Sequence, residues 1–580
     1  MYLAKGQLTA RGIIIGCIGC VVITASSMYT ALKMGALPWP IVLVAIVSLF
    51  ALKALGKTTL NEANVTHTIM SAGAMVAGGL AFTIPGIWIL GGDTSVDWWQ
   101  MLIIALCGTI LGLMFTALLR KHFIEDESDK LEYPMGEAAA QTLIAGDGGK
   151  TGRKLFGAMG FAGIYTFLRD GLGMIPSLLL KGVSIPGVSF GIYNSPMMLA
   201  VGFLVGTGTV VAWFIGALVG DFGLVVAGSN LGFWDVATGQ GMKSSLGMGL
   251  MMGCGVAIII KDVLPGITRT LKRMATSNGG YVAAKCATGG NGEQSTSQDA
   301  QVFASARKNV FKMHPGTIGV VVGAVALVLC FALDLGVLPS IIIVVLCWVT
   351  CAMSAQSVGQ SGIDPMEIFG LIVLLIVAAC SDVTQVQLFF VAAVIAVACG
   401  LAGDVMSDFK AGHVLGTDPG AQWVGEAIGG ILGAFVAVGV LLVLVAAYGT
   451  DAFGPSGQFI SAQATVVATM VGGIPSNSAF LIGLVLGCLL YFVKVPTMML
   501  GLGVYLPFYM SFTAFLGGMA KVVYDQVCKR RDAKLSESER QERAAAHQQD
   551  GMIVASGLLG GESIIGVVLA LVTVTIGLIA

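Results

Sequence analysis

Residues 61–86 read NEANVTHTIMSAGAMVAGGLAFTIPG, and this stretch carries the clearest indication of the fold. Its apolar part is long enough to cross the hydrocarbon core of a bilayer, which takes about 20 helical residues. The side chains from Ser71 to Gly79 are unusually small, and Pro85 follows shortly afterwards. A membrane span interrupted by Gly and Pro is typical of a broken helix, whose freed backbone groups can bind a ligand.

The composition of the whole chain also indicates an integral membrane protein. Of 580 residues, 56% are hydrophobic and 11% are charged, and the mean hydropathy is +0.88. Soluble domains carry about 25% charged residues, so this chain has too few ionic groups to cover a soluble surface. The net charge of −1 gives no indication of nucleic-acid binding. We therefore predict an all-α polytopic membrane protein.

Long apolar runs before and after residues 61–86 predict about sixteen transmembrane helices in total. Glycine pairs four residues apart predict close helix packing, as at Gly249/Gly253 and Gly483/Gly487. Residues 403–413 are interpreted as a polar loop between spans. The predicted spans lie near residues 13–33, 38–55, 66–90, 98–119, 155–179, 197–213, 214–230, 244–264, 316–333, 338–355, 363–381, 385–402, 423–448, 474–493, 496–519 and 552–579.

The two halves of the chain resemble each other in sequence, which predicts a duplication. The sequence ALKMGALP at 31–38 matches ALDLGVLP at 332–339, and residues 195–206 resemble residues 476–487. We expect a first membrane half at 1–267, a cytoplasmic linker loop at 268–315 and a second half at 316–580. Internal repeats with a substrate site at their interface are common in secondary transporters.

The distribution of Lys and Arg in the short loops predicts a cytoplasmic N-terminus. The basic segment 521–543 disagrees with this rule, because counting the predicted spans from a cytoplasmic N-terminus places it outside the cell. The topology of the last two spans, around 521–551, is therefore left open. The 12 cysteines are scattered through apolar runs, so we expect no metal site and no cofactor.

Polar side chains in or beside the spans are the candidates for substrate binding, because they are costly at membrane depth. Arg169 can bind a substrate carboxylate through its planar fork, or it can simply balance the charge of Asp170. The polar start of the 61–86 stretch is either part of the site or an interfacial helix start. Residues 131–141 form either a re-entrant or a surface helix. The substrate-binding candidates are Asn61, Asn64, His67, Thr83, Tyr133, Gln141, Arg169, Gln360, Asp364 and Lys410.

Carboxylic acids in or beside apolar helices are candidate proton carriers, because desolvation favours their neutral form. For any one of them, the alternative is a satisfied hydrogen bond between helices. The proton-coupling candidates are Glu62, Glu132, Glu137, Asp404, Asp408, Glu426 and Glu562.

Six stretches in the same order resemble the oligopeptide transporter family, which includes the yellow-stripe-like metal-chelate transporters. They are NEANVT at 61–66, FTIPG at 82–86, LEYPMGEA at 131–138, DVMSDFKAGH at 404–413, GVYLP at 503–507 and ASGLLGGES at 555–563. The compact loops are more similar to those of prokaryotic members. The resemblance covers nearly the whole chain and implies about sixteen spans built by duplication. It also implies proton-coupled uptake of small peptides.

We therefore predict a secondary active transporter in the inner (plasma) membrane, with a small peptide, protons and the lipid bilayer as partners. Uptake of a peptide-like metal chelate is the alternative, and a homo-oligomer is compatible with the sequence. A channel or an intramembrane enzyme is the remote alternative: Gly400–Asp404 only approximates a protease motif, and His-Glu-x-x-His, Gly-x-Ser-x-Gly and P-loop motifs are missing.

Overall fold

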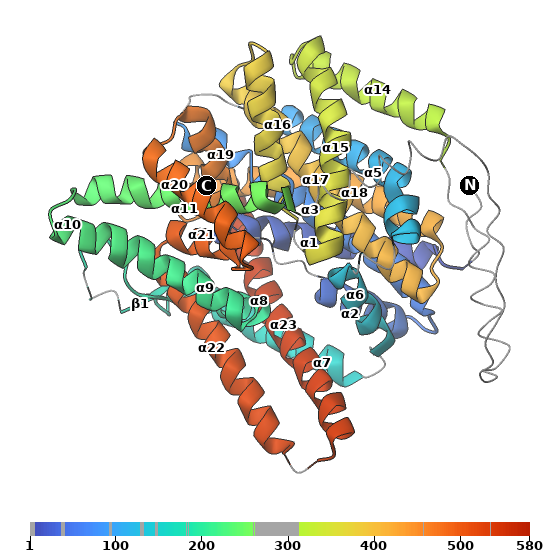
Figure 1. Ribbon diagram of the computed structural model, residues 1–580. Helices are drawn as coiled ribbons and strands as arrows, with labels where there is room; N and C mark the ends of the chain where they lie inside the picture. Colours follow the sequence, from blue (N-terminus) through green and yellow to red (C-terminus); the bar gives the residue numbers. More distant parts are fainter. Residues whose placement is uncertain are drawn as a thin grey trace, which may run out of the picture.

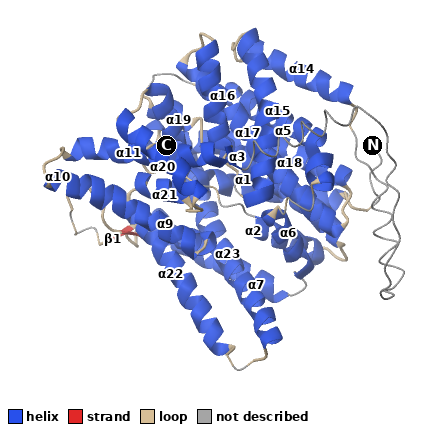
Figure 2. Cartoon of the chain, in the orientation of Figure 1, coloured by secondary structure: helices blue, strands red, loops and turns tan. Residues whose placement is uncertain are grey.

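The computed structural model of the chain is almost entirely helical (Figures 1 and 2). It describes residues 6–579 except 36, 38–40, 92–95, 128–130, 132, 146–148, 181–182, 184, 259, 262–312, 363, 456 and 534. The predicted linker loop therefore lies almost wholly outside the described residues.

The helices before the linker are mostly long, and π-helical segments extend three of them. They are α1 (Ala10–Met34), α2 (Ile41–Ala54), α3 (Leu60–Ala81), α4 (Pro85–Ile89), α5 (Trp98–Arg120), η1 (Lys121–Asp126), α6 (Pro134–Ala145), α7 (Gly149–Thr166), η2 (Phe167–Gly171), α8 (Pro196–Val205), α9 (Thr207–Ala217), η3 (Leu218–Ala227), α10 (Gly228–Asn230) and α11 (Val236–Ile258). Two short strands, β1 (Leu178–Leu179) and β2 (Ile192–Tyr193), pair antiparallel.

The helices after the linker complete the bundle. They are α14 (Pro315–Ala332), α15 (Val337–Ser361), α16 (Met366–Cys380), α17 (Gln385–Leu415), α18 (Pro419–Tyr448), the short 3₁₀ segment η5 (Thr450–Ala452), α19 (Ala462–Gly472), α20 (Asn477–Phe492), α21 (Thr497–Tyr505), α22 (Phe508–Arg531) and α23 (Glu537–Ile579).

Within the described part of the chain, eight helices are long and apolar enough to cross a membrane, and six shorter apolar helices accompany them. Large apolar side chains such as Val320 and Phe331 on α14 and Leu481 on α20 are exposed. Exposed apolar surface of this extent suits contact with lipid rather than water. The predicted all-α polytopic membrane fold is confirmed.

Helices α3 and α17 form the interior of the bundle (Figure 1). Every residue of α3 from Glu62 to Ala81 is buried, and so is every residue of α17 from Phe389 to Gly412. Helix α3 packs against α1, α17 and α18. Because this interior is shielded from lipid, it can hold polar side chains that a lipid-facing helix could not.

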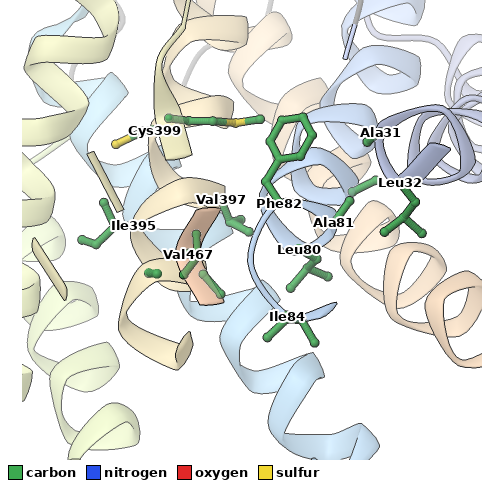
Figure 3. Close-up of a cluster of buried hydrophobic side chains, with 14 of the residues drawn as sticks. Ala31, Leu32, Leu80, Ala81, Phe82, Ile84, Ile395, Val397, Cys399 and Val467 are labelled. Atoms are coloured by element: carbon green, nitrogen blue, oxygen red, sulfur yellow. The ribbon is translucent and has the colours of Figure 1, made fainter. Parts of the chain in front are cut away.

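The predicted break in the span at 61–86 is confirmed. Helix α3 ends at Ala81, and α4 begins at Pro85. Figure 3 shows Phe82 and Ile84 of this break within an apolar cluster that includes Leu32 and Val397. The break frees few backbone groups, because the N–H groups of Phe82 and Ile84 still bond to carbonyls of α3. The Thr83 hydroxyl also donates to Gly79 O at 2.7 Å.

The glycine pairs mostly mark close helix packing, as predicted. The pair Gly249/Gly253 of α11 packs against Gly483/Gly487 of α20, where a Cβ on Gly483 would lie 3.0 Å from Gly249 Cα. Gly206 differs, because it has a φ of +93° and separates α8 from α9. The predicted boundary between the spans at 197–213 and 214–230 is therefore wrong, since the second span begins at Thr207.

The loop predicted at 403–413 is wrong. Residues 403–413 continue α17, because this part of the helix is buried against protein and its polar side chains have protein neighbours. In the segment 521–551, whose topology the sequence leaves open, α22 continues to Arg531 and α23 begins at Glu537. There α22 and α23 form a hairpin that extends away from the bundle (Figure 1). Helix α19 was not predicted.

Candidate functional site

Three acidic side chains meet in the interior of the bundle. Asp404 and Asp408 are four residues apart on α17 and therefore share one face of it, while Glu426 comes from α18. One carboxylate oxygen of each residue lies within 4.8 Å of the others, and each residue is at most 1% exposed. Asp404 Oδ2, Asp408 Oδ1 and both carboxylate oxygens of Glu426 have no hydrogen-bond partner among the described residues. We call these three residues the acidic cluster.

Helix α3 adds His67 and Ser71 to the acidic cluster. These two residues are also four apart and share a helix face. The Ser71 hydroxyl donates to Asp408 Oδ2 at 3.1 Å, and His67 Nδ1 lies 3.7 Å from Asp408 Oδ1. His67 is fully buried, and neither ring nitrogen has a hydrogen-bond partner in the described part of the chain.

Glycines of α18 allow α3 and α18 to approach closely enough to assemble this site. Gly425, Gly429 and Gly433 recur every fourth residue, and each faces α3. A Cβ on Gly425 would lie 2.7 Å from Thr68 Oγ1, and a Cβ on Gly433 would collide with the backbone of Gly73. Small residues at this spacing let two helix backbones meet, so Glu426 can reach the face that carries His67.

The acidic cluster can bind protons or hold a cation. Carboxylates this close together in a low-dielectric interior cannot all stay ionised alone, because desolvation and mutual repulsion both favour the neutral form. Asp364 brings a further carboxylate to this region, since its Oδ2 lies against Gly403 of α17, the residue before Asp404. The thiol of Cys20 on α1 lies at the same junction and donates to Gly429 O at 3.3 Å.

The predicted residues at the start of α3 anchor this helix to its neighbours. Glu62 accepts two hydrogen bonds from Arg11, at 2.7 and 2.6 Å, and further ones from Thr9 and Thr58. The Asn64 amide donates to Thr417 Oγ1 at 3.2 Å, and this hydroxyl donates to Asn61 Oδ1 at 3.1 Å. The N-cap of α3 is Thr59, whose side chain accepts a hydrogen bond from the Glu62 N–H.

The predicted residues of the 131–141 segment lie on or just before α6, which packs against α17 and α2. Tyr133 is fully buried, and its hydroxyl donates to Ala355 O at 3.0 Å. Gln141 donates to Glu137 Oε1 at 2.9 Å, and Lys410 Nζ donates to Leu131 O at 3.2 Å. Glu132 and the side chain of Gln360 lie outside the described residues.

A second polar cluster joins η2 to α23. The Arg169 fork donates to both carboxylate oxygens of Asp170, at 2.7 and 2.6 Å, and Nη2 also donates to Glu562 Oε1 at 2.8 Å. Glu562 in turn accepts hydrogen bonds from the Ser195 hydroxyl and from the Met197 N–H at the start of α8. The predicted charge balance between Arg169 and Asp170 is present, and Glu562 extends it.

Sequence reasoning missed several buried charged residues, among them Lys33, Lys243 and Asp221. Lys33, near the end of α1, is 7% exposed and donates to Tyr29 OH at 3.2 Å. Lys243 on α11 pairs with Asp221 on η3 at 2.6 Å. Lys33 and Asp221 are lone ionisable residues inside apolar runs, and that signal could have singled them out.

The structure thus brings some of the predicted residues together and leaves others apart. His67 joins the acidic cluster, with Asp364 beside Asp404. Arg169 and Glu562 meet in the second cluster. Of the other predicted residues that the structure describes, some bond to a different element, namely Asn61, Glu62, Asn64, Tyr133 and Lys410, whereas Thr83, Glu137 and Gln141 bond within their own segment.

Comparison with known proteins identifies the family. The family model of the OPT oligopeptide transporter protein matches residues 7–573, nearly the whole chain. A protein of Haemophilus influenzae named "Putative oligopeptide transporter" is 25% identical, over 94% of this chain and 92% of its own length. With its many apolar helices, the chain is a multi-pass membrane transporter. It belongs to the oligopeptide transporter family.

Proposed function

We propose that this chain imports small oligopeptides by proton-coupled symport and alternating access. The observation that carries this proposal is the acidic cluster, whose carboxylates lie within 4.8 Å of one another in the interior. The relative named "Putative oligopeptide transporter" supports peptides as the cargo.

The cluster suits proton coupling because its charge state depends on its surroundings. Buried away from water, its acids favour the neutral form, whereas exposure to an aqueous pathway favours ionisation. A helix movement that alternately exposes the cluster to either side would therefore load and release protons. His67 and Ser71 from α3 contact Asp408 directly. Asp364 lies against Gly403, next to Asp404 in the chain, and Cys20 from α1 donates to Gly429 O, three residues after Glu426.

Helix α1 links this cluster to the region around Arg169. Cys20 lies at the cluster, and Ser26 further along α1 donates to Ser563 Oγ at 2.8 Å, next to Glu562. A rigid helix that touches both regions can transmit a change at one to the other. We place the substrate near the second cluster, between the two membrane halves at 1–267 and 316–580.

The duplication receives support from local structure. Ser195 and Ser476 are both N-caps of corresponding helices, α8 and α20, and each accepts a hydrogen bond from the third residue of its helix. The matching segments at 31–38 and 332–339 each contain the end of an apolar helix, Met34 of α1 and Ala332 of α14, and each has a glycine with positive φ, Gly35 and Gly336. We propose a cytoplasmic N-terminus and a location in the inner (plasma) membrane.

The test is uptake of a labelled library of di- to tetrapeptides by proteoliposomes that contain the purified protein. Accumulation should require an inward proton gradient and collapse when a protonophore is added. Uptake that ignores the proton gradient and follows a sodium gradient would reject proton coupling. Failure to take up any peptide under either gradient would reject the peptide cargo.

A further inference from the structure

Lys33 is a buried cation that lacks, among the described residues, the close carboxylate partner found at three other buried cations. Arg120, Arg169 and Lys243 each lie within 2.8 Å of a carboxylate oxygen. Lys33 has no carboxylate within 4.0 Å in the described part of the chain, although only 7% of its surface is exposed. An ammonium group buried without a carboxylate in direct contact is costly, so its position requires an explanation.

Aromatic rings surround the Lys33 ammonium. Its Nζ lies 5.4 Å from the ring centroid of Tyr29 and 5.7 Å from that of Tyr193. Tyr29 packs edge-on against Phe459, and Tyr193 packs against Tyr509. Cation–π contacts offset part of the desolvation cost, but one tyrosine hydroxyl at 3.2 Å does not neutralise the charge.

Irregular backbone converges on this position. Helix α1 ends at Met34, one residue after Lys33, and Tyr193 lies on the short strand β2. Ser461, with a left-handed φ of +45°, donates its N–H to Leu32 O at 2.9 Å. Within a membrane protein, non-helical backbone is tolerated where it is buried in protein or lines a water-filled cavity. Ends of interrupted helices are also where transporters bind their cargo.

Arg169 is a second cation close to Tyr193. Its guanidinium carbon is 5.6 Å from the ring centroid of Tyr193, so both cations contact the same ring. The fork of Arg169 is already filled by Asp170 and Glu562. A carboxylate that enters this region therefore meets one cation that is fully paired and another that is not.

We propose that Lys33 binds the C-terminal carboxylate of the transported peptide, with Tyr29 and Tyr193 packing around the terminal residue. This inference rests on the proposed peptide cargo and adds the residue that binds the C-terminal end of the peptide. A charge-assisted hydrogen bond of this kind discriminates strongly against a ligand that lacks the charge, by about tenfold to a hundredfold. A peptide amide is such a ligand.

The experiment measures binding of two peptide pools to the full-length protein in lipid nanodiscs. One pool holds di- to tetrapeptides as free acids, and the other holds the same peptides as C-terminal amides. The unmodified protein should bind the acids at least tenfold more tightly. Lys33→Met should bring the two affinities to within about twofold, and Lys33→Arg should retain the preference.

The matched control is the double variant Asp221→Asn with Lys243→Met. It removes another buried cation from the membrane region together with its partner, and it should keep the preference for acids. An equal affinity of the unmodified protein for acids and amides would overturn the inference while leaving peptide transport intact, and this measurement needs no variant to fold. An unchanged preference in folded Lys33→Met would also overturn it. If neither pool binds, the proposed peptide cargo itself fails.

Discussion

Arg169 on η2 and Glu562 on α23 are separated by 393 positions in the sequence, yet Arg169 Nη2 donates to Glu562 Oε1 at 2.8 Å. Both side chains are fully buried. The Glu562 carboxylate also accepts the Met197 N–H and the Ser195 hydroxyl at the start of α8. The Glu562 carboxylate therefore connects α23, the last helix of the chain, to η2 and to α8, which both precede the linker.

We expect Arg169→Lys to lower the melting temperature by several degrees and to change peptide affinity by less than threefold. Lysine keeps the charge but cannot make the fork to Asp170 while also pairing with Glu562. The measurement compares the melting temperature with the binding affinity of the same preparation. A tenfold loss of affinity at an unchanged melting temperature would show instead that Arg169 receives the substrate carboxylate.

Glu426→Gln should abolish proton-driven accumulation and retain exchange of labelled for unlabelled peptide. The amide keeps the shape of the side chain but cannot lose a proton, so uptake no longer gains from the gradient. Both modes are measured in the same proteoliposomes. Asp451→Asn, on an exposed acid outside the cluster, is the control. Normal accumulation by Glu426→Gln would remove this residue from the coupling mechanism.

Gly433→Val should destabilise the protein by about 1–3 kcal/mol, which is typical of overpacking in a close-packed interior. A Cβ at this position meets the backbone of Gly73 on α3, which has no side chain that could move away. Gly439→Val on the same helix is the matched control, because a Cβ there has nothing within 4 Å. Equal melting temperatures for the two variants would mean that α3 and α18 are not held this closely.

A cysteine introduced at Ser277, in the predicted linker loop, should resist labelling by an impermeant thiol reagent in intact cells. The positive charges of this segment, among them Lys272, Arg273 and Lys285, favour the cytoplasmic side. The same cysteine should react once the cells are permeabilised. Labelling in intact cells would reverse the proposed orientation of the whole chain.

The break in the span at 61–86 shows what a local pattern can predict. Pro85 cannot donate a helical hydrogen bond, so the interruption after Ala81 follows from the sequence alone. The loop predicted at 403–413 shows the opposite case. Polar residues in a helix look like a loop unless it is known that protein rather than lipid surrounds them.

The amino-acid sequence alone predicts a helical membrane protein, many of its helix boundaries, and which residues within the helices are polar. These properties depend on side chains a few positions apart, through apolar length, small-residue spacing and proline. Only the tertiary structure decided which polar residues meet. His67 and Asp408 approach to 3.7 Å because α3 packs against α17, and Lys33 of α1 lies beside Tyr193 of β2. No local pattern carries that information, since a buried charge is costly or stable only according to the neighbours that the fold gives it.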